Sequence, residues 1–152
     1  MALELALACD LRLATADAIV GLPEIAFGIV PDVGGTTRLV RAVGEPRARE
    51  LILTGRLLRA RTAERYGLVH EVADDAAGLD ALLARRTAQL AAHPPTALAL
   101  AKTLSQASAD TGTQTSFRIE GVVQTALLAN PELAAQFPKA LAFIKAAMAN
   151  PE

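Results

Sequence analysis

The stretch that decides the fold runs from Gly21 to Leu39 and reads GLPEIAFGIVPDVGGTTRL. It places one carboxylate, Glu24, directly after a proline in an otherwise apolar run, where a charge is costly unless it is used or paired. Gly28 allows a sharp bend, Pro31-Asp32 predicts a turn, and Gly34-Gly35 lets the backbone approach a neighbour closely. A lone acid followed by such turns indicates a functional site.

Around this stretch, short strands and short helices alternate. Polar–apolar alternation predicts strands at 10–15, 18–21 and 68–72, and helix-forming runs with glycine stops predict helices at 2–9, 36–43, 46–53 and 60–66. Thr36 or Thr37 is expected to cap the helix at 36–43. Cys9, the one cysteine, is expected to be a small buried side chain, because a single cysteine forms no internal disulfide.

The carboxyl-terminal half changes character and is rich in alanine. It predicts long helices at 79–92, 95–107, 115–128 and 133–148, with Pro138 interrupting the last of them. Their apolar faces are wider than a single core requires. Some of this surface is therefore expected to contact another subunit.

Composition narrows the class of protein. The chain has 152 residues, 52% of them hydrophobic, and a net charge of −1. This balance offers no basic surface for nucleic acid or for a membrane, and no apolar run reaches the roughly 18 residues of a membrane span. We expect a soluble, cytoplasmic protein that binds neither nucleic acid nor a membrane. His70 and His93 have no neighbours at ligand spacing, so no metal site is predicted.

A second acid, Glu4, lies upstream in the run MALELALACDLRLA, again between apolar residues. Two carboxyl groups in apolar surroundings are suited to moving protons. Plainer interpretations exist for both residues. Glu4 could be a first-turn acid that interacts with the helix dipole, and Glu24 could be a solvated turn residue.

Several of these motifs together resemble a known family. The segments are ELALACDLRLA from Glu4, then Pro23-Glu24, PDVGGT from Pro31, Thr54-Gly55 and Gly67-Leu68-Val69. In order and spacing they resemble the second half of the enoyl-CoA hydratase/isomerase (crotonase) family, from residue 1 to about residue 74 and more weakly to about residue 102. The resemblance implies an α/β fold: part of a ββα spiral core over 1–78, followed by an all-helical oligomerisation region over 79–152. It also implies a homotrimer or hexamer.

The resemblance further implies the chemistry of the site. Glu4 would activate water and Glu24 would protonate the α-carbon of a trans-2-enoyl-CoA thioester, in fatty-acid or related acyl-CoA catabolism. Pro31 and Gly34 would contact the substrate. Coenzyme A arrives as part of the substrate, so no separate cofactor is expected.

Asp32 has two interpretations. It is either a turn residue after Pro31 or, as in family members that shift double bonds, an acid that moves a proton between carbons. Hydration is therefore the first expectation and isomerisation the alternative.

The resemblance also implies two backbone N–H donors for the thioester oxygen. One comes from a loop earlier than this sequence, and the other from a glycine just ahead of the first catalytic acid. Counting back three places from Glu4 leads to Met1, and no glycine stands there. We expect a chain that begins in mid-fold, through truncation or a misplaced start, with impaired catalysis. The rival expectation is a non-catalytic remnant that acts only in self-association.

Overall fold

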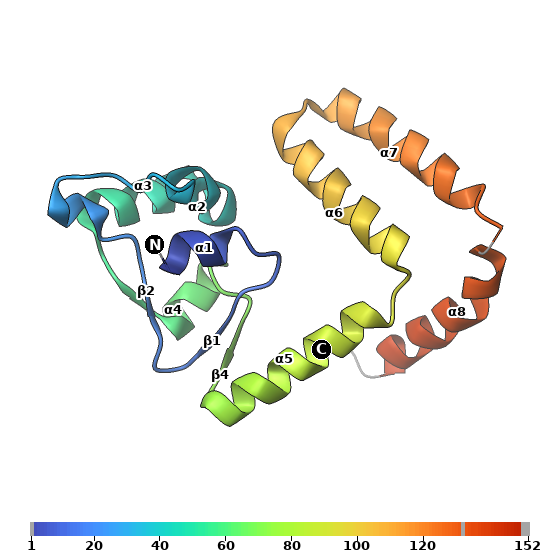
Figure 1. Cartoon of the computed structure of the whole chain (residues 1–152), viewed down its shortest axis with the longest axis horizontal. Helices are drawn as coiled ribbons and strands as arrows, with labels where there is room; N and C mark the ends of the chain where they lie inside the picture. The colour runs from blue at the N-terminus through green and yellow to red at the C-terminus, as the bar shows by residue number, and fades with distance from the viewer. Residues whose placement is uncertain (1, 132, 150–152) are drawn as a thin grey trace. The chain divides into compact units, whose positions relative to one another are not determined.

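A computed structural model describes residues 2–131 and 133–149. The chain forms two compact units, Met1–Ala88 and Gln89–Glu152. The first unit contains α1 (Ala2–Leu7), β1 (Leu13–Thr15), β2 (Ile19–Val20), the 3-10 helix η1 (Glu24–Phe27), α2 (Gly35–Val43), α3 (Glu45–Thr54), β3 (Leu58–Arg59), α4 (Ala60–Arg65), β4 (Glu71–Ala73) and most of α5 (Ala76–Ala91) (Figure 1). The second contains α6 (Pro95–Asp110), α7 (Thr113–Leu128) and α8 (Leu133–Ala149).

The strands of the first unit form two short pairs. β1 lies parallel to β4, with Ala14 opposite Val72, and the two run side by side in Figure 1. β2 is antiparallel to β3, with Val20 opposite Leu58. Both pairs join segments that are far apart in the sequence.

The core of the first unit is aliphatic. Its largest fully buried side chains are Leu22, Leu39 and Leu68, each exposed by 2% or less. Each comes from a different part of the chain: the segment after β2, α2, and the turn before β4. Burying one such leucine contributes on the order of 1.5–3 kcal/mol, so these three side chains tie the helices to the strands.

One face of α2 packs against α1. The buried residues of α2 are Gly35, Leu39 and Val43, spaced four apart and therefore on one side of the helix. α1 presents Leu3 and Leu7, also four apart and buried. At the amino end of this face Gly35 has no side chain, which leaves a space between α1 and α2.

Arg12 and His70 link the segments that precede β1 and β4. The Arg12 N–H donates to Nδ1 of His70 at 3.0 Å, and the His70 N–H donates to the Arg12 carbonyl at 2.8 Å. The Arg12 guanidinium also donates to the Leu68 carbonyl at 2.6 Å. Burial lowers the pKa of His70, and the positive charge of Arg12 lowers this pKa further.

This link predicts a pH dependence of stability. The pKa of His70 is lower in the folded protein than its ordinary value of about 6.5, so the folded state binds fewer protons than the unfolded state. The stabilisation is complete above pH 6.5 and is lost as the pH falls toward the folded-state pKa. His70→Asn keeps an acceptor for the Arg12 N–H but does not titrate. Thermal melts between pH 7.5 and pH 5 should show a smaller loss of Tm for His70→Asn than for the wild type; equal losses would contradict the assignment.

α5 is anchored to β4 by an ion cluster. Glu71 accepts hydrogen bonds from Arg85 at 2.7 Å and from Arg86. The hydrogen bond from Arg86 is the largest cause of the lowered pKa of Glu71. The third turn of a mostly exposed helix is thus fixed to the strand pair.

In the second unit, α6 packs on α7 (Figure 1). At their connection the hydroxyl groups of Thr111 and Ser116 lie 2.9 Å apart, and Ser116 is buried. Many large apolar side chains of this unit are exposed: Phe117, Val122, Leu128, Phe137, Leu141, Phe143, Ile144 and Met148. None of the helices in residues 2–131 and 133–149 has the length and apolar character needed to cross a membrane.

The predicted helices are all present, with bounds shifted by a few residues. Glycine ends α2 at Gly44 and α3 at Gly55, as expected. The predicted strand at 68–72 begins only at Glu71, because Leu68 and Val69 are core residues in the turn after α4. The predicted domain division at residue 78 concerns the family's spiral core and stays a prediction.

Three local expectations are wrong, and one strand was missed. Cys9 is exposed rather than buried, because α1 ends at Leu7. Neither Thr36 nor Thr37 is the cap of α2, since the helix begins at Gly35 after Gly34. The strand β3 was not predicted, and Pro138 lies inside α8 without ending it.

Candidate active site

Glu4 is a buried carboxylate at the amino end of α2. It lies on α1 and is only 3% exposed. Its Oε1 atom accepts a hydrogen bond from the Val33 N–H at 3.3 Å. The positive end of the α2 dipole faces the same region and interacts favourably with the negative charge. Glu4 is therefore held by the loop before α2, which is 29 residues further along the chain.

Gly35 makes the space that the Glu4 side chain fills. A β-carbon at residue 35 would lie 2.5 Å from Oε1 and 2.8 Å from Cγ of Glu4, and 2.9 Å from Cβ of Pro31. Real β-carbons essentially never approach other atoms so closely. The glycine at the start of the α2 face is thus required by the carboxylate beside it.

The loop from Pro31 to Gly34 forms the wall of this site. Pro31 is buried and Asp32 is exposed. The hydroxyl of Thr36 donates to the Pro31 carbonyl at 3.4 Å. Gly34 has φ +81°, a left-handed conformation that favours glycine. The structure thus brings Glu4, Pro31 and the double glycine together, and leaves the Asp32 side chain at the surface.

Glu24 begins η1, directly after its N-cap residue Pro23. Its Oε2 atom is buried. η1 ends at Gly28, which has φ +73°, as the expected bend requires, and it packs against α3. A β-carbon at Gly55 would lie 3.1 Å from Cγ2 of Ile25. Glu24 is thus seated on a different helix from Glu4, and their pairing across one cleft stays a prediction.

Three contacts of this site were not found from the sequence: those of Val33 and of Gly35 with Glu4, and that of Arg38 with Val33. The Nη1 atom of Arg38 donates to the Val33 carbonyl at 2.7 Å. The spacing of Gly35, Leu39 and Val43 was the available signal, because a glycine at the end of a buried helix face marks a close neighbour. The predicted donor position at Met1 lies outside the described residues.

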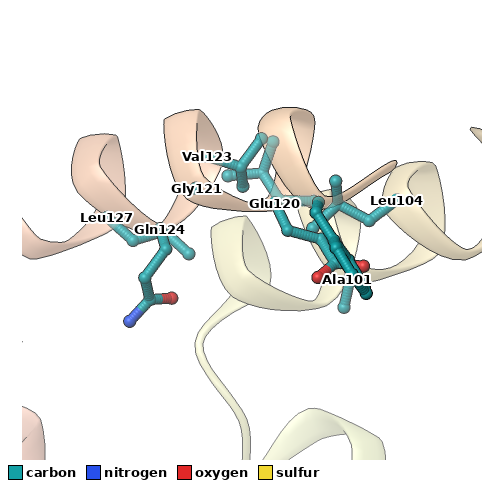
Figure 2. Close-up of a pocket in the computed structure, with 9 residues that line it drawn as sticks. Ala101, Leu104, Glu120, Gly121, Val123, Gln124 and Leu127 are labelled. Carbon is teal, nitrogen blue, oxygen red and sulfur yellow. The ribbon is translucent and has the colours of Figure 1, made fainter. Parts of the chain in front are cut away.

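A separate groove of about 520 Å³ lies between α6 and α7 in the second unit. Figure 2 shows Glu120, Gln124 and Leu127 on α7, with Ala101 and Leu104 on α6. Its lining is mostly apolar and carries one carboxylate. It lacks the pair of acids that proton transfer to and from carbon requires, so we place the candidate chemistry at Glu4.

The two histidines have separate structural surroundings. His70 belongs to the first compact unit, where it binds Arg12, and His93 belongs to the second. The His93 ring meets the ring of Phe143 edge-on, with centroids 5.4 Å apart.

The model of the family described as enoyl-CoA hydratase/isomerase matches residues 2–133. The chain belongs to the enoyl-CoA hydratase/isomerase family. The predicted resemblance is confirmed, and so is the fold class, an α/β fold with a helical carboxyl-terminal region.

Relatives within the enoyl-CoA hydratase/isomerase family are mostly named hydratases. The 2,3-dehydroadipyl-CoA hydratase of Escherichia coli K12 is 37% identical over 129 residues, covering 85% of this chain and 50% of the relative. The short-chain-enoyl-CoA hydratase of Clostridioides difficile is 52% identical over 71 residues, 47% of this chain and 46% of the relative. The chain thus spans about half the length of these relatives.

Solved structures of the enoyl-CoA hydratase/isomerase family show the same fold. A protein of Thermobifida fusca assigned to the enoyl-CoA hydratases, solved in complex with CoA, superposes with a TM-score of 0.80 at 40% identity. The match covers 88% of this chain and 51% of that one.

Proposed function

We propose that this chain carries the acid–base residues of an enoyl-CoA hydratase, which adds water to a trans-2-enoyl-CoA thioester. The observation that carries the proposal is the buried Glu4 carboxylate, held by the Val33 N–H beside Gly35. Family membership and the hydratase names of the relatives support it.

Each of the two acids has a role in the proposed reaction. The Glu4 carboxylate takes a proton from water while the water oxygen bonds to the β-carbon. Electrons of the double bond move toward the thioester, and the Glu24 carboxyl gives its proton to the α-carbon. The product is a 3-hydroxyacyl-CoA, and proton exchange with solvent restores both acids. General acid–base catalysis of this kind contributes about 10²–10⁴-fold to the rate.

An acyl-CoA substrate fits the surface near these acids. Phe27 and Val33 are 76% and 61% exposed, and Ile29 and Val30 between them in the chain are exposed as well. Such apolar groups can contact an acyl chain. The CoA complex of the Thermobifida fusca relative supports coenzyme A as the carrier. In this proposal Pro31 and Gly34 contact the substrate, and no separate cofactor takes part.

Isomerisation of the double bond is the second candidate. Asp32 is exposed on the loop next to Val33, the residue that binds Glu4. An acid at this point could move a proton between carbons of a 3-enoyl-CoA. We propose hydration first, because Glu4 is buried and hydrogen-bonded to this loop, whereas Asp32 is exposed.

A cytoplasmic homotrimer or hexamer is the proposed assembly. The exposed apolar residues of α6–α8, such as Phe117 and Met148 at 63% and 78% exposure, support a subunit interface. Sedimentation velocity tests this proposal, and a monomer at micromolar concentration would contradict it.

The hydratase proposal is tested by mixing the purified chain with crotonyl-CoA. We expect loss of the absorbance of the conjugated thioester and a product heavier by one water. Conversion of a 3-enoyl-CoA without any hydration would instead support the isomerase. A folded protein that catalyses neither reaction would contradict both and leave the self-association role.

A further inference from the structure

Arg38 holds two consecutive carbonyl groups of the loop before α2. Its Nη1 atom donates to the Val33 carbonyl at 2.7 Å. Its backbone N–H donates to the Gly34 carbonyl at 3.0 Å. A hydrogen bond from a charged guanidinium is shorter and stronger than one between neutral groups. Arg38 is thus a strong anchor for this loop.

Val33 transmits this anchor to Glu4. The carbonyl of Val33 accepts from Arg38, and its N–H donates to Oε1 of Glu4 at 3.3 Å. The Val33 side chain is 61% exposed, so packing contributes little to its position. The Val33 N–H is therefore oriented by the hydrogen bonds to the two peptide groups around it, together with the buried Pro31 and the Thr36 bond to the Pro31 carbonyl.

Gly34 makes such an anchor necessary. Its φ of +81° is accessible to glycine, but glycine also has the largest conformational freedom of any residue. The Arg38 guanidinium lies against the α-carbon of Gly34 and would collide with a β-carbon there. The arginine thus restricts the most flexible point between Val33 and α2.

We infer that Arg38 is a positioning residue for Glu4: through the Val33 peptide it fixes the carboxylate that activates water. The expected effect on kcat rests on the proposed hydratase function, whereas the expected effect on the Val33 amide does not. Arg38 acts through Val33 and does not itself contact the reacting atoms. A competing role for the same guanidinium is direct binding of a phosphate group of coenzyme A.

Kinetics separate the two roles. A positioning residue affects the reacting geometry, so Arg38→Met should lower kcat about tenfold and leave KM within about twofold. Arg38→Lys can still donate to the Val33 carbonyl and should recover part of kcat. Arg49→Met is the matched control, because Arg49 lies on α3 in an exposed pair with Glu45; its kinetics should equal those of the wild type.

Hydrogen exchange tests the same inference without any turnover. In the ¹⁵N-labelled full chain, exchange of the Val33 amide should be about tenfold faster in Arg38→Met than in the wild type. The Leu68 amide, bonded to the Ala63 carbonyl at 2.9 Å in the core, should be unchanged in both. This pattern would support the inference even if the wild type failed to hydrate crotonyl-CoA, a failure that would remove only the proposed function.

Three results would overturn the inference. Unchanged exchange at Val33 would show that Arg38 does not hold this peptide. Equal acceleration at Val33 and Leu68 would show a general effect on folding. A rise in KM with unchanged kcat in Arg38→Met would show the phosphate-binding role instead.

Discussion

Glu4→Gln is expected to lower kcat for hydration of crotonyl-CoA by about 10²–10⁴-fold. Glutamine has nearly the same size as glutamate and keeps an oxygen that can accept from the Val33 N–H, the partner of Glu4 at 3.3 Å. It cannot take a proton from water. Loss of a negative charge beside the α2 amino end should cost at most about 1 kcal/mol of stability. Glu4→Gln should therefore lose most of its turnover, while its Tm stays close to that of the wild type.

Glu120→Gln is the matched control for this prediction. Glu120 is an exposed glutamate on α7, in the groove of the second unit. The same substitution there should leave kcat within about twofold. A Glu4→Gln variant that keeps more than a tenth of wild-type kcat would contradict the role given to Glu4.

The roles of the two acids can be separated in the same experiment. Exchange of an α-proton of butyryl-CoA with D₂O needs a group that acts on the α-carbon, but no attack by water. Glu24→Gln should therefore lose this exchange, whereas Glu4→Gln should keep it. Loss of exchange in Glu4→Gln alone would reverse the assignment.

Gly35→Ala is expected to reduce both activity and stability. The new methyl group would lie 2.5 Å from Oε1 of Glu4 and 2.9 Å from Cβ of Pro31. Overpacking of this kind costs about 1–3 kcal/mol, and moving a catalytic group by about 1 Å can cost about 10²-fold in rate. Steady-state kinetics and denaturant unfolding measure the two effects.

Gly121→Ala is the control for this prediction, because it makes the same glycine-to-alanine change where no atom lies close to the new methyl group. Gly121 lies inside α7, and a β-carbon there would meet no atom within 4 Å. Alanine should stabilise this helix by about 0.5–1 kcal/mol. If Gly35→Ala also raised the stability and kept its activity, the close packing of Glu4 on Gly35 would be wrong.

The helices were predictable because their signals are local. Glycine at Gly44 and Gly55 ends α2 and α3 whatever the surroundings, and Pro95 begins α6. Pro138 is the exception, since α8 continues through it. The strand β3 has only two residues and exists because Val20 offers Leu58 a partner. No local pattern over Leu58–Arg59 could reveal that pairing.

Residue types and their order along the chain were enough to indicate the family, the helical second half and the two acids Glu4 and Glu24. They could not tell which backbone would meet Glu4. The Val33 N–H and Gly35, which has no side chain, come next to this carboxylate only when α1 and α2 pack together. That packing is made by Leu3 and Leu7 of α1 and by the buried face of α2. A contact between residues 29 positions apart depends on burial of those aliphatic side chains, and this is a property of the folded chain rather than of any one segment.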